Sequence, residues 1–382
     1  MSEKLRKEYL SYLAQYGLEP RSIPAEAAAL QAAVVEHLKN QSKALGDDFM
    51  TSLIEETYEK NKERYLNETR HPSVVLIETT AAEVEQAIQG IDKYRDLLKV
   101  DVFFGEFPTG SINAQVVKTD SGFLVLINSG LLVSIKQIVE FLVMGDPDDT
   151  TNEVANRTTI DGVVAVLQAY LRYGDPFFGP KPLSGGLEML LIHALTRACQ
   201  AFVVAHEFGH MIAGHFEGKT TQLEQLETNA GTISVIKKEW KQELEADVIA
   251  HKIILGIDDY AQLDLAIIDE AFSSDEFKST VLARATEIKA AIAAPFVFLT
   301  IDAILADVQE ALRIASHVKR PDNTHPPARK RMANLMPNFK GLASKYTGYI
   351  NFAGILMAHY DEICGRLVKG MLETPGRDAE NE

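Results

Sequence analysis

His206 and His210 stand four positions apart in a long apolar stretch, and this pair constrains the fold more than any other feature of the sequence. Residues four apart project from one face of an α-helix, so both imidazoles can reach a single cation. Apart from Glu207, the neighbours between 202 and 213 are apolar or small, which predicts a buried helix. Burying two histidines and a glutamate is costly unless something compensates them. The alternative is a chance pattern in which hydrogen bonds within the core satisfy both histidines.

Glu207 directly follows the first histidine and gives the pattern a chemical use. One step round the helix, its carboxylate lies beside a bound cation rather than in the coordination sphere. A carboxylate in that place can take a proton from a metal-activated water molecule as general base. The motif therefore predicts a helix that carries two metal ligands and a catalytic base.

A catalytic zinc site needs a third protein ligand and an open position for water. In the metzincin pattern the third ligand is a histidine ten residues after the first, but Phe216 occupies that position here and cannot ligate a metal. His215 is one residue short of it, and Gly214 can end the helix before it. Two roles stay open for His215, a metal ligand or a residue beside the site with a capping role.

Glu243 is the better candidate for the third ligand, and it opens the segment Glu-Leu-Glu-Ala-Asp at 243–247. Glu243 and Asp247 share one helical face, so the first can ligate the metal while the second accepts the free ring N–H of a liganding histidine. Ala246 is small enough for two helices to approach closely. The alternative is an exposed acidic face of a helix, but its pairing with the histidine motif favours a metal site.

The first half of the chain predicts a mixed region of helices and strands. Residues 1–70 have apolar residues at helical spacing. Segments typical of strands follow at 73–80, 99–107, 112–117 and 123–129. A polar, glycine-containing loop at 118–122 predicts a hairpin between the last two, and hence a small antiparallel sheet. Helices are expected at 131–143 and 161–172, with a turn-rich loop or lid between them at 145–159.

The second half is expected to be helical, which makes the whole an α+β protein that is mostly helix. A helix with the histidine motif starts near Gly186, another spans 240–255, and helical segments continue to 319 with a break at Pro295. The turn at 319–327 introduces a short helix, and a final one spans 341–372. We divide the chain into an N-terminal helical region (1–70), a core with both motif helices (71–255), a helical insertion (256–319), a C-terminal part of the core domain (320–372) and a flexible tail (373–382).

Charge and composition argue against several partners and locations. The net charge of −16 repels phosphate backbones and anionic lipid, which argues against nucleic acid. Two cysteines, Cys199 and Cys364, cannot build a disulfide framework and suit a reducing compartment. The N-terminus lacks the apolar core of a secretory signal. The apolar runs 290–301 and 349–358 are shorter than the roughly 20 residues that cross a bilayer. We expect a cytoplasmic protein without an integral membrane segment.

The sequence resembles the gluzincins and, within them, the HtpX and CAAX prenyl protease family. Three blocks carry the resemblance: HEFGHMIAGH at 206–215, ELEAD at 243–247 and THPPARKRM at 324–332. A weaker likeness is INAQVV…GFLVLINSGLL at 112–132, and all four blocks occur in the family's order. Membrane-bound members have transmembrane helices beside the motif and none is evident in this sequence, so the resemblance is to a soluble form.

The resemblance implies a zincin-like metallopeptidase core that holds one Zn²⁺ per chain. By this likeness His206, His210 and Glu243 are the zinc ligands, and Glu207 is the catalytic base. Asp247 then orients one of the liganding histidines. Zinc is the default metal, although sites with two histidines and one glutamate also accept cobalt or manganese.

Three further residues are candidates for the cleft. His325 resembles a family histidine that can donate to the oxyanion of the tetrahedral intermediate; the alternative is a helix-start residue beside Pro326. Arg331 is expected to brace the acidic site by pairing with a carboxylate. Asn113 lies in a strand whose free edge could pair with an extended peptide, and it is a tentative substrate-binding residue; an ordinary Asn near a turn is the alternative.

The leading hypothesis is a zinc-dependent endopeptidase that acts on a protein or peptide. One alternative is a protease with a single target, silent until triggered, for which a regulatory partner is expected. Another is a non-catalytic binding or regulatory module that keeps zinc as structure. Glu207 argues against the module, because a purely structural site has no use for an uncoordinated carboxylate beside the metal.

Overall fold

The computed structural model describes residues 3–20, 36, 39–40, 43–44, 51–52, 55, 71–98, 100–107, 114–145, 153–173, 179–180, 188–216, 223–228, 231–236, 239–263, 279–315, 326–339 and 352–373. Two candidate residues of the cleft, Asn113 and His325, lie outside the described residues. The described chain is mostly helical, with one three-stranded sheet and one two-stranded hairpin. This confirms the predicted α+β class with helix in excess.

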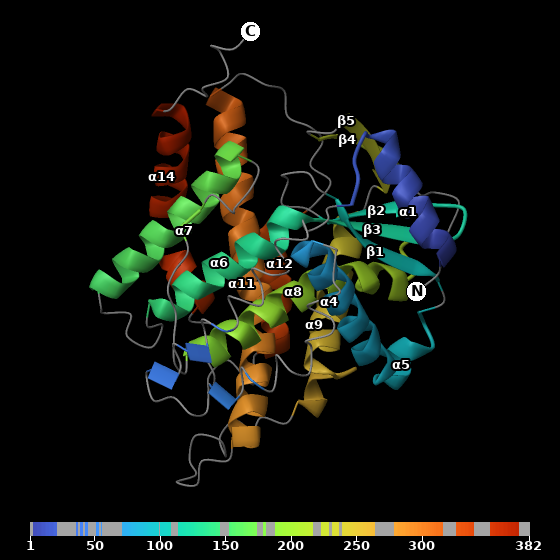
Figure 1. The fold of residues 1–382 in the computed structure, drawn as a ribbon, viewed down its shortest axis with the longest axis horizontal. Helices are drawn as coiled ribbons and strands as arrows, with labels where there is room; N and C mark the ends of the chain where they lie inside the picture. The colour runs from blue at the N-terminus through green and yellow to red at the C-terminus, as the bar shows by residue number, and fades with distance from the viewer. Residues whose placement is uncertain are drawn as a thin grey trace.

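A buried helix, α8, lies at the centre of the helical part of the molecule (Figure 1). The larger helices are α4 (Pro72–Gln89), α6 (Ser129–Met144), α7 (Glu153–Tyr173), α8 (Glu188–Ile212), α9 (Trp240–Leu255), α11 (Ser279–Ala315), α12 (Ala328–Leu335) and α14 (Tyr360–Glu373). Helix α8 packs against α4, α6, α9 and α11, and every residue from 202 to 212 is buried. Because neighbours surround it, the apolar sequence around the histidine motif is the sequence of a core helix.

The sheet lies to one side of the helices and is mixed, not antiparallel throughout as predicted. Its strands are β1 (Val102–Phe107), β2 (Ala114–Lys118) and β3 (Phe123–Asn128), in the order β1-β3-β2. Strands β2 and β3 form the predicted antiparallel hairpin, whereas β1 runs parallel to β3. All six residues of β3 are buried, which suits a central strand. Because β1 and β2 run in opposite directions on either side of β3, β3 is antiparallel to β2 and parallel to β1.

Helices cover both faces of this sheet (Figure 1). Helix α1 (Glu3–Gln15) packs Leu5, Tyr9 and Leu13 on the face that carries Phe103 and Phe107. The hydroxyl of Tyr9 also donates a hydrogen bond to the carbonyl of Glu106 at 2.6 Å. On the other face, the ring of Phe104 lies 4.8 Å from that of Phe208 on α8. The sheet therefore rests directly on the helix that carries the histidine motif.

Residues 73–80 form part of α4, so the strand predicted there is wrong. His71 caps the helix by accepting a hydrogen bond from the backbone N–H of Ser73, and Pro72 occupies the first turn. The buried positions recur at steps of three and four: Val74, Ile77, Ala81, Val84 and Ile88. The β-branched residues of 73–80 favour a strand locally, but burial of one face over five turns outweighs that preference.

The loop predicted at 145–159 is also wrong in part, because α7 begins at Glu153. Residues 146–152 lie outside the described residues. Thr159, which indicated a turn, is buried in the helix, where its hydroxyl donates to the carbonyl of Phe141 on α6 at 3.1 Å. A threonine inside a helix is tolerated when its hydroxyl finds such a partner.

Helix α11 continues through Pro295, where the sequence predicted a break. A proline has no N–H, so the carbonyl of Ala291, four residues earlier, lacks its usual partner in the helix. That carbonyl lies beside the buried imidazole of His251 on α9 and raises the pKa of the ring. The hydroxyl of Tyr260 lies 3.0 Å from Nδ1 of the same ring. Helix α11 stays whole here, with the His251 ring of α9 beside the carbonyl that proline leaves without a helical partner.

Two helices are long and apolar enough to span a membrane by length and composition alone. They are α8 and the part of α11 from Ala283 to Ala315, with 56% and 78% of their most apolar windows buried inside the fold. A core helix in a compact protein passes the same test, so the finding is weak evidence for a membrane span. The absence of an integral membrane segment stays a prediction.

Replacement of His251 is expected to flatten the pH dependence of stability. Burial lowers the pKa of His251 to about 3, although the Ala291 carbonyl and the charge of Asp247 oppose the shift. The unfolded chain therefore binds this proton below about pH 6.5 while the folded chain does not, and stability falls as pH falls, by about 1.4 kcal/mol per pH unit. In the metal-free His251→Gln protein, the unfolding free energy should therefore depend less on pH between pH 6 and pH 4, by about that slope. Unfolding in urea at several pH values measures it. Equal slopes in the two proteins would contradict the prediction.

Candidate metal centre

The candidate site lies where α8 and α9 cross at very short range. A Cβ atom added to Gly209 on α8 would lie only 2.8 Å from the backbone oxygen of Ala246 on α9. Ala246 is itself fully buried, so neither position tolerates a larger side chain without movement of a helix. This close crossing brings Glu243, in the first turn of α9, against the histidine face of α8. The positive end of the helix dipole at that turn favours the negative charge of Glu243.

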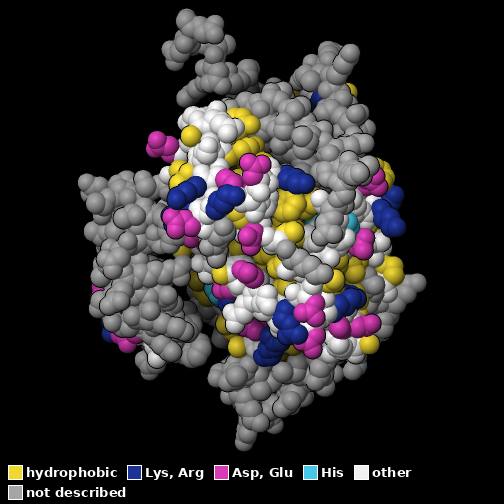
Figure 2. Space-filling model, turned by 90° about the vertical axis from the view of Figure 1, so that its right-hand side faces the viewer, with side chains coloured by type: hydrophobic (Ala, Val, Ile, Leu, Met, Phe, Trp, Pro, Cys, Tyr) yellow, Lys and Arg dark blue, Asp and Glu magenta, His cyan; other side chains and the backbone are white. Residues whose placement is uncertain are grey.

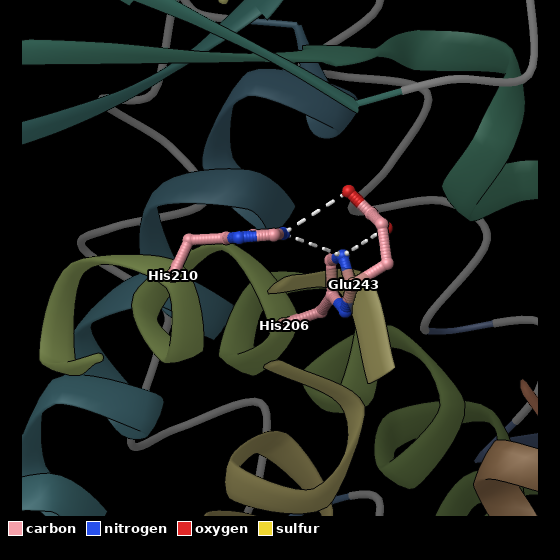
Figure 3. Close-up of side chains that lie close together, drawn as sticks. All are labelled: His206, His210 and Glu243. Carbon is pink, nitrogen blue, oxygen red and sulfur yellow. Dashed lines mark hydrogen bonds and ion pairs between the residues drawn. The ribbon is translucent and has the colours of Figure 1, made fainter. Parts of the chain in front are cut away.

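His206, His210 and Glu243 point toward one another (Figure 3). Nε2 of His206 lies 3.1 Å from Nε2 of His210 and 3.2 Å from a carboxylate oxygen of Glu243. The other oxygen of Glu243 lies 3.3 Å from Nε2 of His210. Ligand atoms about 2.0 Å from a tetrahedral zinc ion are about 3.3 Å apart, so these three donors fit such an ion. All three residues are buried, and their donor atoms form a candidate metal site.

A buried chain of polar groups holds His206. Its Nδ1 lies 2.9 Å from Oδ1 of Asp247, which leaves Nε2 to face the candidate site. Arg331 on α12 donates to both oxygens of Asp247, from Nε at 2.8 Å and from Nη2 at 2.6 Å. Burial raises the pKa of Asp247, but the charge and hydrogen bonds of Arg331 outweigh it and lower that pKa below its ordinary value. Asp247 is therefore a carboxylate and accepts the ring N–H of His206.

Without a metal ion, His206 holds its proton unusually well. Burial lowers the pKa of this imidazole, yet hydrogen bonds to Asp247 and Glu243 and their charges outweigh burial and raise the pKa to about 9. At neutral pH the metal-free ring is thus a cation between two carboxylates. The same acidic surroundings that favour this proton also favour a divalent cation in its place.

Helix α8 ends directly after the motif, and the end turns His215 back toward His210. Gly214 has a φ of 69°, and the N–H of His215 donates to the carbonyl of His210 at 2.9 Å. This backbone geometry is a Schellman motif, which glycine favours. The His215 ring then lies with Nδ1 2.8 Å from Nδ1 of His210. His215 is therefore beside the site, at the ring nitrogen of His210 that is not directed at Glu243.

Phe216, at the position of the metzincin third ligand, packs against the site instead of ligating it. Its ring is stacked on that of His210, with centroids 5.6 Å apart. The same phenyl ring contacts Phe123 of β3, with centroids 5.1 Å apart. Phe216 thus joins the histidine helix to the sheet.

Glu207 is 3% exposed and follows His206 on α8. A step of one residue turns a helix by about 100°, so its carboxylate lies beside the face that carries the two histidines. The role of Glu207 as the base stays a prediction. The two candidates outside the described residues lie next to described elements: Asn113 directly precedes β2, which contacts α8, and His325 precedes α12.

Two partners of the site residues were not found from the sequence. Oε2 of Glu245 lies 3.3 Å from Nε2 of His215, and Oδ2 of Asp302 lies 3.7 Å from Nη1 of Arg331. Glu245 is two residues from Glu243, so it projects from another side of α9, and only the crossing of α8 and α9 brings it to His215. Asp302 closes the run 290–301, and no spacing rule connects it to α12.

A family model described as Peptidase family M48 matches residues 177–337, which is less than half of the chain. The matched region contains α8, α9, α11 and α12, and with them the three donors, Glu207, Asp247 and Arg331. No curated protein and no solved structure gives a match. The family match supports a metal-dependent protease, and the mostly helical fold with its small sheet is consistent with the core of such an enzyme.

Gly209→Ala is expected to separate α8 from α9. Because the new methyl group would lie 2.8 Å from the Ala246 backbone, we expect a loss of about 1–3 kcal/mol in unfolding free energy. Zinc affinity should fall as well, since Glu243 is on the displaced helix. The control is Gly365→Ala in α14, where the added methyl meets no atom within 4 Å and should stabilise the helix by about 0.5–1 kcal/mol. Chemical unfolding and zinc competition with a chromophoric chelator measure both effects, and an unchanged Gly209→Ala protein would contradict the close crossing.

Zinc binding at pH 7 is expected to release about one proton per ion, since the metal displaces the proton that His206 holds in the metal-free protein. The apparent zinc affinity should therefore decrease as pH falls below about 9. Calorimetric titration in two buffers with different ionisation enthalpies gives the number of protons released. A binding enthalpy that is the same in both buffers would show that no proton leaves.

Proposed function

We propose that this protein is a zinc-dependent endopeptidase of the HtpX and CAAX protease type, with His206, His210 and Glu243 as zinc ligands. The observation that carries the proposal is the group of three buried donors with the spacing of a tetrahedral site. A structural zinc site fills its fourth position with protein, whereas a catalytic site leaves it to water and substrate. Among the described residues the group has three members, which supports a catalytic site.

Glu207 is the proposed general base. A bound zinc ion would supply a Lewis acid that polarises the scissile carbonyl and acidifies water. Glu207 accepts a proton from the attacking water molecule and passes it to the leaving amine. Asp247, fixed by Arg331, keeps the Nδ1–H of His206 hydrogen-bonded, so that Nε2 stays directed at the ligand position.

The proposed substrate is an extended segment of a protein or peptide that lies along β2. Within the described sheet β2 pairs only with β3, and β5 (Gly231–Ile236) contacts β2 without a ladder between them. Strand β2 also contacts α8, and strands of the sheet lie above the site in Figure 3. Pairing of a peptide with a strand edge gives main-chain affinity with little sequence selectivity.

Asn113 and His325 complete the proposed cleft by the resemblance of their sequence blocks. Asn113 directly precedes β2 and would hold substrate backbone there. His325 directly precedes Pro326 and the helix that carries Arg331, and its imidazole would donate to the oxyanion. Both roles are proposals for residues outside the described part of the chain.

The charge distribution agrees with a protein substrate rather than a nucleic acid. On the face shown in Figure 2, the Lys and Arg side chains of the described residues are interspersed with Asp and Glu. With a net charge of −16, such a surface does not attract phosphate backbones. We place the protein in the cytoplasm, in line with its two free cysteines, Cys199 and Cys364.

Glu207→Gln tests the proposed mechanism. The amide keeps the size of the side chain but cannot accept a proton, so we expect bound zinc to remain and hydrolysis to fall by about 100- to 10,000-fold. Zinc content is measured by elemental analysis, and activity with casein and a mixture of quenched fluorescent peptides. Glu188→Gln, an exposed change in the first turn of the same helix, is the matched control and should keep full activity. A zinc-loaded Glu207→Gln protein with full activity would contradict the proposed mechanism.

The same assays separate the endopeptidase from the other two hypotheses. Cleavage of one protein in a lysate without cleavage of casein would indicate a protease with a single target. Zinc bound stoichiometrically without hydrolysis of any substrate would indicate a regulatory module. The family match does not favour that module.

A further inference from the structure

We infer that His215, held in turn by Glu245, is a positioning residue that fixes the ring of His210 for metal binding. The inference rests on the proposed function, because it concerns how this chain prepares His210 as a zinc ligand. The family match and the motif spacing give no role to the pair His215 and Glu245. The contacts of three side chains carry the argument.

The first contact joins His215 to the side of His210 that faces away from the candidate site. Nδ1 of His215 lies 2.8 Å from Nδ1 of His210, while Nε2 of His210 faces Glu243 at 3.3 Å. The second contact lies at the opposite end of the His215 ring, where Nε2 is 3.3 Å from Oε2 of Glu245. His210, His215 and Glu245 thus form a chain that begins at the site and ends on a carboxylate.

The chemistry of imidazole assigns the protons along this chain. To ligate a metal through Nε2, the neutral ring of His210 must carry its proton on Nδ1. That N–H then donates to Nδ1 of His215, which must be unprotonated to accept it. The proton of His215 is therefore on Nε2, from which it donates to Glu245. A carboxylate at the end of the chain favours this arrangement and makes His210 a better electron donor to a metal.

The backbone places the His215 ring independently of its side-chain bonds. Its N–H caps α8 by donating to the His210 carbonyl, a contact that any residue at this position can make. The imidazole is 7% exposed and lies against the edge of the His210 ring, while Phe216 stacks on the face of that ring. Substitution of the His215 side chain therefore removes the hydrogen bond to His210 and leaves the helix end in place.

The two liganding histidines then have supports of the same kind but different rigidity. His206 is held by Asp247, which is fully buried and paired with Arg331. His210 is held by His215, whose partner Glu245 has a side chain that is 54% exposed. A hydrogen bond to an exposed carboxylate is weaker than one to a buried carboxylate, because water competes for it. Loss of Glu245 should therefore cost less metal affinity than loss of the His215 ring.

Three variants of the full-length protein test the inference by zinc affinity, measured in competition with a chromophoric chelator. His215→Leu fills the space but removes the acceptor, and we expect zinc affinity to fall by about 10- to 100-fold. His215→Asn keeps an acceptor two bonds from Cβ, as Nδ1 is in histidine, and should recover most of the loss. Glu245→Gln should reduce affinity by a smaller factor. His359→Leu, which removes a partly exposed histidine on the segment before α14, is the control and should bind zinc like the wild type.

Cobalt substitution supplies a readout that general destabilisation does not move. The visible absorption spectrum of bound Co²⁺ reports coordination geometry, and we expect it to change in His215→Leu and to return to that of the wild type in His215→Asn. Equal zinc affinity in wild type and His215→Leu would overturn the inference, as would an Asn variant no better than Leu. If the wild type itself fails to bind zinc, the proposed function fails too, which is a different result.

Discussion

The crossing of α8 and α9 at Gly209 and Ala246 is the contact on which the rest of the site depends. A side chain at Gly209 would meet the backbone of α9, so the distance between the helices is set by the absence of one. At that distance Glu243 reaches the histidines of α8, Asp247 reaches His206 and Glu245 reaches His215. A single crossing thus brings three residues of α9 to α8, with Glu243 and Asp247 on one face of α9 and Glu245 on another. The sheet adds no donor to the described cluster, but it covers α8 through Phe208 and Phe216, while α1 packs on the opposite face of the sheet.

Burial of the polar groups of the site costs free energy unless each group has a partner. In the structure, each of these groups is held by the next one. Glu243 and Asp247 are both fully buried beside His206, and Arg331 from α12 supplies a cation against them. The charge of Arg331 keeps Asp247 ionised, and Asp247 in turn determines which nitrogen of His206 is free to ligate. The segment 324–332 therefore contributes to the site through the electrostatics of Arg331, far along the chain from the histidines.

The sequence was most informative where side-chain spacing alone decides geometry. His206 and His210 on one helix, Glu243 and Asp247 on another, and the boundaries of α9 at 240–255 all follow from helical periodicity. The errors came where distant packing overrides local preference: the β-branched run at 73–80 became α4, and α11, packed against α8, α9 and α14, continues through Pro295. The parallel pairing of β1 with β3 and the contact between Glu245 and His215 were also beyond the sequence, because both depend on how elements meet in space. Spacing along one element says nothing about the angle at which two elements cross.

The position of the His251 ring beside the Ala291 carbonyl links α9 to α11. Most contacts between helices are apolar and tolerate small sliding, but this polar ring lies beside one carbonyl that Pro295 leaves without a helical partner. A shift of α9 by one residue, about 1.5 Å along its axis, would take the imidazole away from that carbonyl. Because His251 lies one turn beyond Asp247 and two turns beyond Glu243, the same shift would move both carboxylates along α8. A proline in α11 is therefore linked, through His251, to the axial position of the acidic groups of the site.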